Sequence, residues 1–160
     1  MLSVLHIENI AVIESADILF GPGFNALTGE TGAGKSIVVD AMSAVTGERT
    51  SRELIRTGAK SALVTGAFTG VKALPWLTEN GLAPDENGEL LLQREIMPDG
   101  KNVCRVNAAY ITVQHIVTIC AHSRNTGRIK ILPNYDIQAR LCKTDIQPHC
   151  TGKQGNHIPV

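Results

Sequence analysis

The first two thirds of the chain alternate between apolar and polar residues in short runs that are typical of β-strands. In residues 2–7 the apolar side chains fall on both faces, as in a strand that is covered on each side. Residues 15–20 alternate more regularly. The same pattern predicts further strands over residues 24–28, 62–68, 89–96 and 103–107, with a tight turn at 98–101 before the last of them. Residues 24–28 are expected to be a short buried strand.

A helical period interrupts this series between the third and fourth predicted strands. Ile37, Ala41 and Val45 recur at intervals of four residues and give a helix that begins at Lys35 one apolar face. Gly47 follows where glycine commonly ends a helix. The order of strand, loop and helix predicts an α/β fold.

No period of either kind is recognised beyond about Gln114. The chain has 160 residues and is neutral as a whole, but residues 1–115 carry a net charge of −4 and residues 116–160 one of +4. No glutamate occurs after Glu95, and three of the four cysteines lie in the second segment. We therefore expect residues 115–160 to be an irregular tail, disordered in its glycine-bearing part at 151–157.

The sequence gives little support to a zinc site, and equally little to a secreted or membrane-spanning protein. Cys142, His149, Cys150 and His157 could be arranged around zinc, but their spacing matches no standard pairing of close ligands, so we interpret them as incidental. The chain shows neither a secretory signal nor a run of about 18 apolar residues. We expect free thiols and a cytoplasmic protein.

The loop between the third predicted strand and the helix carries the most specific motif. It fits G-x-x-x-x-G-K-[ST], the phosphate-binding loop, and consists of Gly29, Glu30, Thr31, Gly32, Ala33, Gly34, Lys35 and Ser36. Glycines let backbone N–H groups turn inward toward an anion, and the helix directs its positive end to the same point. Lys35 is expected to reach the β- and γ-phosphates of ATP, and the Ser36 hydroxyl to ligate Mg²⁺.

Charged residues that follow the loop have two possible interpretations. Arg49, Arg52 and Arg56 lie in a polar stretch that reads most simply as a solvated connection. Alternatively, they lie near the phosphates or along a path for nucleic acid. Asp40 faces away from Lys35 by helical geometry, so we expect it to be a capping or surface residue rather than a magnesium ligand.

Several runs in the first 114 residues resemble the RecN family, bacterial DNA repair ATPases that are related to the SMC proteins. The matching runs are residues 5–14, 23–28, the whole phosphate loop, 37–41, 47–49, 55–58, 92–96, 98–101 and 105–107. The resemblance implies the N-terminal half of an ABC/SMC-type P-loop ATPase head, with a mixed β-sheet and a phosphate-loop helix. It also implies a C-terminal half-head, a second head that closes on ATP, and DNA as partners in recombinational repair at the nucleoid.

The chain departs from this family in its second segment. It shows no coiled coil, no signature motif and no apolar strand that ends in paired acidic residues. We therefore divide it into residues 1–114, the half-head, and residues 115–160, an aberrant tail, which we hypothesise to be an out-of-frame reading. Such a fragment would bind ATP without hydrolysing it, since groups that hydrolysis needs are not identifiable.

Two other functions remain open from the sequence. One is a small self-contained nucleoside or nucleotide kinase, with Arg124, Arg128 and Arg140 at the acceptor site. The other is an interaction module or inert remnant. Thermal stabilisation by ATP would separate the ATPase fragment and the kinase, which both bind nucleotide, from the interaction module or remnant.

Overall fold

The computed structural model describes residues 1–28, 34–71, 75–125 and 156–159. Its helices and strands are β1 (Leu2–Ile10), β2 (Ile13–Leu19), β3 (Asn25–Thr28), α1 (Lys35–Val45), the 3-10 turn η1 (Arg52–Leu54), β4 (Ala62–Thr69), α2 (Pro75–Glu79), β5 (Glu89–Ile96), β6 (Asn102–Val106), β7 (Ala109–Ile111), α3 (Val113–Asn125) and β8 (Asn156–Pro159). No helix in this part of the chain is both long and apolar enough to cross a membrane.

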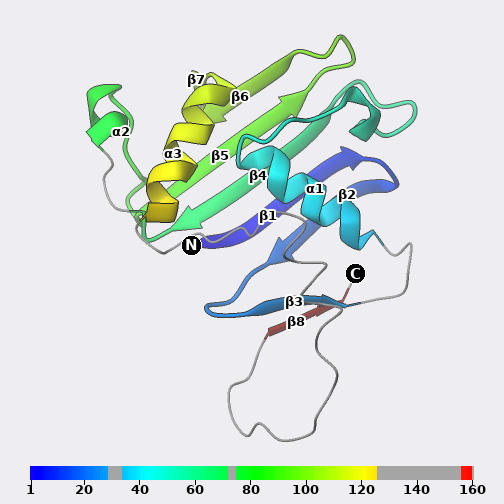
Figure 1. The fold of residues 1–160 in the computed structure, drawn as a ribbon, viewed down its shortest axis with the longest axis horizontal. Coiled ribbons are helices and arrows are strands. Elements are labelled where there is room, and N and C mark those ends of the chain that lie inside the picture. The colour runs from blue at the N-terminus through cyan, green and yellow to red at the C-terminus, as the bar shows by residue number, and fades with distance from the viewer. Residues whose placement is uncertain (29–33, 72–74, 126–155, 160) are drawn as a thin grey trace, which may run out of the picture.

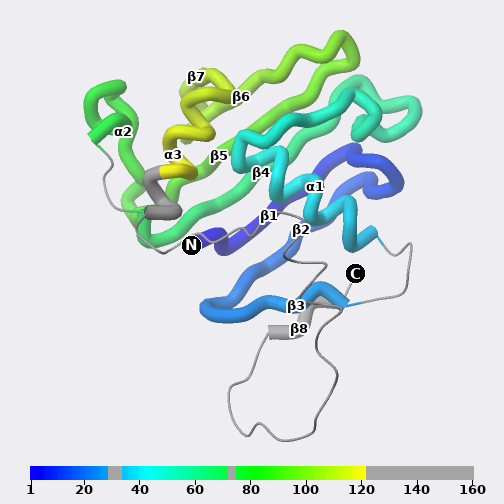
Figure 2. The backbone as a smooth tube through the Cα atoms, in the orientation of Figure 1, coloured from blue at the N-terminus to red at the C-terminus, as the bar shows by residue number. Residues whose placement is uncertain are grey.

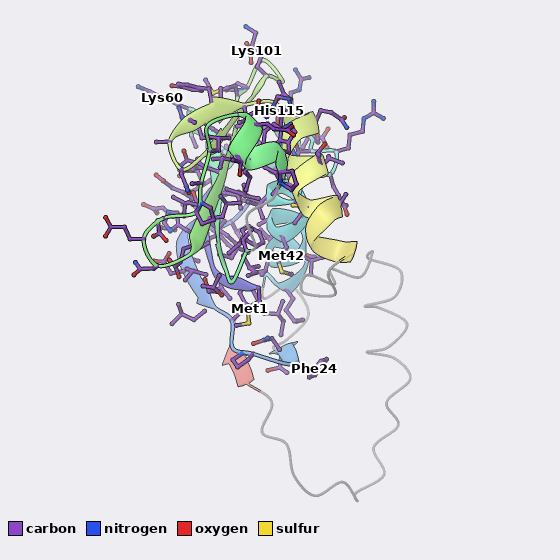
Figure 3. The ribbon with its side chains drawn as sticks, turned by 90° about the vertical axis from the view of Figure 1, so that its left-hand side faces the viewer. Met1, Phe24, Met42, Lys60, Lys101 and His115 are labelled. Carbon is purple, nitrogen blue, oxygen red and sulfur yellow. The ribbon has the colours of Figure 1, made fainter. Side chains whose placement is uncertain are left out.

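Six of these strands form one antiparallel sheet in the order β2-β1-β4-β5-β6-β7. Helices α1 and α3 lie on the same face of this sheet (Figures 1 and 3). The predicted α/β class is therefore confirmed. The strands of residues 62–68, 89–96 and 103–107 form as expected, and β5 and β6 pair around the tight turn.

The core lies between the sheet and its two helices. Strand β4 buries alternate residues, among them Val64 and Phe68, because successive side chains of a strand point to opposite faces. Helix α1 buries Val38, Ala41, Ala44 and Val45, while Ile37 is only half-buried. The apolar stripe of α1 is thus displaced by one residue at its start from the predicted one.

The opposite face of the sheet is polar, so the expectation that β1 is covered on both sides is wrong. Strand β1 buries Leu5, Ile7 and Ile10, whereas the side chains between them are half-buried. A row of polar residues crosses the open face in register, namely Asp17, His6, Thr65, Gln93, Arg105 and Tyr110. Antiparallel sheets commonly leave one face to solvent in this way.

Strand β3 does not join the six-stranded sheet, and the prediction of a buried strand here is also wrong. It pairs in parallel with β8 (Figure 1), and β3 lies beside the main sheet (Figure 2). Residues of β3 are half-buried or exposed, and the neighbouring Phe24 is 75% exposed. Two strands alone cannot enclose an apolar side chain, so the apolar composition of residues 24–28 did not predict burial. The pairing of residues 156–159 also corrects the expected disorder around His157.

Helix α3 corrects the expectation that the pattern fails from Gln114. Ile116, Ile119 and Cys120 are all buried, at the spacing i, i+3, i+4 that places side chains on one helical face. The Thr112 hydroxyl accepts a hydrogen bond from the His115 N–H, and His115 Nδ1 accepts one from the Thr112 N–H. This reciprocal pair caps the start of the helix. The ordered unit therefore continues past residue 114.

The two helices meet where α1 ends. Gly47 has a φ of 93°, and the Glu48 N–H donates back to the Ser43 carbonyl, so Gly47 ends the helix as predicted. A Cβ atom on Gly47 would lie 2.6 Å from Cγ2 of Val117 in α3. This close approach requires glycine and fixes α3 against the end of α1.

Candidate nucleotide-binding site

The first turn of α1 carries the part of the phosphate-loop motif that the structure describes. Gly34 is the N-cap residue of α1, with a φ of 87° that glycine adopts without strain. Lys35 and Ser36 are the first two residues of the helix, the former half-buried and the latter exposed. Gly29, Glu30, Thr31, Gly32 and Ala33 lie outside the described residues, so their roles stay predictions.

The N-terminal end of α1 has properties that suit an anion. Its N-cap residue, Gly34, has no side chain that could cap it, and the first turn of the helix contains no acidic residue. Helix termini leave the first N–H groups without partners in the helix, and the helix dipole makes this end positive. The Ser36 hydroxyl is an oxygen donor of the kind that Mg²⁺ prefers. The residues present therefore fit the phosphates and metal of Mg²⁺–ATP.

Strand β3 leads toward this helix and is itself held by a closed turn. The Asn25 side chain accepts a hydrogen bond from the Gly21 N–H at 3.0 Å and donates one to the Gly21 carbonyl at 2.9 Å. Such asparagine bonds stabilise turns because they replace backbone partners. This turn fixes where the chain enters β3, and β3 leads directly into the predicted loop.

Of the three arginines that follow α1, one has a structural role. The Arg56 side chain donates to the Val12 carbonyl at 2.7 Å and lies 3.7 Å from a Glu14 carboxylate oxygen. Backbone bonds from Ala11 to Leu54 and from Arg56 to Asn9 attach the same stretch to the β1–β2 turn. Arg49 and Arg52 are exposed. The stretch is thus held against the sheet by Arg56, with its other two arginines in solvent.

Sequence reasoning missed the most polar group of the core. Arg94 on β5 is buried, and burial lowers the pKa of its guanidinium below the ordinary value. A signal was present, because Arg94 is in phase with Leu90, Leu92 and Ile96 on the buried face of β5. A charged residue at such a position predicts a hydrogen-bonded buried charge rather than a surface group.

The thiols and possible metal ligands can be placed only in part. Cys104 and Cys120 are buried and belong to no disulfide bond. Within the described ranges, no three histidine, cysteine or acidic residues are grouped closely enough to hold a metal ion. Cys142, His149 and Cys150 lie outside these ranges, as do Arg128 and Arg140 of the kinase hypothesis.

The comparisons with known proteins define the class first. Residues 4–106 match the family model described as an AAA domain. The fold resembles a solved chain reported under "Structural biochemistry of ATP-driven dimerization and DNA stimulated activation of SMC ATPases", with a TM-score of 0.68, 23% identity and 92% of each chain covered. The SMC head domain from Thermotoga maritima matches with a TM-score of 0.56 and 24% identity over 72% of this chain and 40% of that one. The chain belongs to the AAA domain family.

Within this class the sequence is RecN-like. The chain is 42% identical over 133 residues to "DNA repair protein RecN" of Bacillus subtilis (strain 168), which covers 81% of this chain and 22% of that protein. The protein of the same name from Haemophilus influenzae is 32% identical over 148 residues, 88% of this chain and 26% of its own length. The chain is thus an N-terminal RecN fragment that spans about a quarter of these relatives. Both matches include more of the chain than residues 1–114 contain, so the similarity continues beyond the expected boundary.

Proposed function

We propose that this chain is the ATP-binding N-terminal part of a RecN-like DNA repair ATPase. The observation that carries the proposal is the position of Gly34, Lys35 and Ser36, the last three residues of a phosphate-loop motif, at the N-terminus of helix α1. Lys35 contacts the β- and γ-phosphates, Ser36 ligates Mg²⁺, and the N–H groups of residues 29–34 bind phosphate oxygens. The family match and the RecN-like sequence support nucleotide binding at this place.

The proposal extends to the partners of the complete protein. The relatives are named as DNA repair proteins, and a neighbouring fold is described with ATP-driven dimerization and DNA-stimulated activation. We infer a C-terminal half-head, a second head and DNA as partners, in recombinational repair of double-strand breaks at the nucleoid of the cytoplasm. This fragment supplies the phosphate-binding side of the nucleotide site.

Replacement of Lys35 tests the site directly. Lys35→Ala removes a cation from the phosphates, and a hydrogen bond to a charged group contributes about 1.5–3 kcal/mol, so we expect affinity for ATP–Mg²⁺ to fall by about tenfold or more. Isothermal titration calorimetry measures this on the full chain. Lys60→Ala is the matched control, because Lys60 is exposed on the connection before β4 (Figure 3).

The control should bind as the unaltered chain does. Equal affinity of the Lys35→Ala and Lys60→Ala variants would show that nucleotide, if bound, is not held at the start of α1. Magnesium omission should weaken binding in the unaltered chain, since the Ser36 hydroxyl acts through the metal.

A further inference from the structure

The side chain of Arg94 is 3% exposed, and it is the only charged side chain in the buried set of the described residues. Its Nε donates to Oδ1 of Asn102 at 2.8 Å, and its Nη2 to Oγ1 of Thr50 at 3.0 Å. Its Nη1 donates to the carbonyls of Ala44 at 2.8 Å and Glu48 at 2.6 Å. These four acceptors are neutral, so Arg94 functions here as a set of directed donors.

Two of the acceptors belong to the end of α1. Ala44 lies in the last turn of the helix, and Glu48 follows shortly after it. The last carbonyls of a helix have no partner within the helix, and the helix dipole makes this end negative. A buried cation that donates to both carbonyls therefore attaches the C-terminal end of α1 to β5. Because guanidinium is planar and its donors are fixed, this attachment also determines orientation.

The attachment continues into the β5–β6 hairpin. Oδ1 of Asn102 accepts from Thr50 at 3.1 Å as well as from Arg94, and Nδ2 of Asn102 donates to the Gly100 carbonyl at 3.0 Å. Three separate segments thus share one network: the end of α1, the connection after it and the hairpin. Hydrogen-bond networks of this kind restrict their members to one arrangement when all of them are satisfied.

We propose that Arg94 is a positioning residue for the phosphate-binding end of α1. The inference rests on the function proposed above. Helix α1 has 11 residues, about 16 Å at 1.5 Å per residue, and its residues Lys35 and Ser36 lie at the end opposite Arg94. A helix of this length moves as a rod, so a shift at Ala44 displaces Lys35 and Ser36 by a similar amount. Arg94 thereby determines the position of α1 on the sheet and the rotation of α1 about its own axis.

The experiment must separate positioning from a simple contribution to stability. Arg94→Lys keeps the charge but loses the planar set of donors. Thr50→Val removes the hydroxyl that accepts from Arg94 and donates to Asn102. Leu77→Ala is the matched control, because Leu77 is buried in α2, which lies beside α3 and apart from α1 (Figure 1). Each variant of the full chain is measured for its melting temperature and, well below that temperature, for its Kd for ATP–Mg²⁺.

We expect Arg94→Lys to raise the Kd by about fivefold or more, the lower end of typical coupling between linked sites. Leu77→Ala should lower the melting temperature without changing the Kd. An equal Kd for the Arg94→Lys and Leu77→Ala variants would overturn the proposal. If Arg94→Lys does not fold, Thr50→Val decides: a rise in Kd of about twofold or more supports positioning, and an unchanged Kd refutes it.

Hydrogen exchange provides a readout that does not depend on nucleotide. Arg94→Lys should speed amide exchange at residues 35–40 as well as at 44–48, because the whole of helix α1 is then held less tightly on the sheet. Faster exchange confined to residues 44–50 would overturn the proposal even if affinity fell. If the unaltered chain bound no ATP, the proposed function would fail, whereas the exchange at residues 35–40 would still decide the role of Arg94.

Discussion

Cys104 is a buried thiol whose protonation is linked to folding. Burial raises the pKa of Cys104 above its ordinary value, and the positive charge of Arg94 opposes part of that rise. The folded state therefore keeps the thiol proton to higher pH than the unfolded state does. The resulting stability is complete below the ordinary thiol pKa of about 8.5 and is lost as the pH rises through the folded pKa.

We expect the free energy of unfolding to decrease as the pH rises above about 8.5, and to decrease less in Cys104→Ala than in the unaltered chain. Urea denaturation at several pH values measures both slopes. The alanine variant will be less stable at every pH because a cavity forms, so the comparison concerns the slopes alone. Parallel pH profiles would show that Cys104 does not contribute to the alkaline loss.

At the scale of elements, the contact between α1 and α3 depends on one glycine. Gly47→Ala adds a Cβ 2.6 Å from Val117 Cγ2 and 3.1 Å from its backbone nitrogen, at a left-handed φ. We expect a loss of about 2–4 kcal/mol in unfolding free energy, from backbone strain and overpacking together. Chemical denaturation measures it.

Gly100→Ala is the control for the backbone part of this effect. Gly100 has a φ of 85°, and nothing lies within 4 Å of the position that a Cβ atom would take there, so only strain of about 1–2 kcal/mol should result. If the Gly47 and Gly100 variants lost the same stability, α3 would not pack on α1 as the structure has it.

Elements with a regular local pattern could be predicted from the sequence. The apolar residues of strands β4, β5 and β6 alternate clearly, and those of helix α1 repeat clearly, so the local pattern is enough to predict these elements. Helix α3 has only three buried positions among its described side chains, and one of them is the thiol Cys120 and not an aliphatic residue. The exposure of Phe24 depends on which strands β3 joins, and local pattern carries no such information.

Of the candidate site, the helix could be predicted. The motif indicated a helix that begins at Lys35, because phosphate binding restricts both residue type and spacing, and the roles of Lys35 and Ser36 stay predictions. The network of Arg94 could not be derived, since its acceptors at Ala44, Glu48 and Thr50 are backbone or hydroxyl groups far away in sequence. Only the phase of Arg94 on β5 indicated that it is buried.

At the scale of the whole molecule, the ordered unit should require α3 but not the chain beyond it. A chain that ends at residue 112 loses Ile116 and Ile119 from the core, each worth about 1.5–3 kcal/mol of burial. We expect this truncation to unfold at clearly lower urea concentration than one that ends at residue 125. Equal midpoints would favour the expected boundary near residue 114 over one after α3.

The chain should release no phosphate from ATP above background. Hydrolysis needs a second magnesium carboxylate, a residue that orients water and an opposing motif, and loss of such groups costs orders of magnitude in rate. Phosphate release is measured with and without linear DNA, beside Lys35→Ala to detect contaminants. Turnover of about 1 per second that disappears in the variant would instead favour a self-sufficient kinase or hydrolase.

The pairing of β3 with β8 has a consequence for the order of folding. It joins Asn25 to Asn156 and Thr28 to Pro159, so most of the chain lies between the partners. Closing so long a loop is entropically unfavourable, whereas the hairpins β1–β2 and β5–β6 close only short ones. We expect the hairpins to form early and the β3–β8 pair to form last and to open first. The strand that precedes the phosphate loop would then gain its partner only after the six-stranded sheet has assembled.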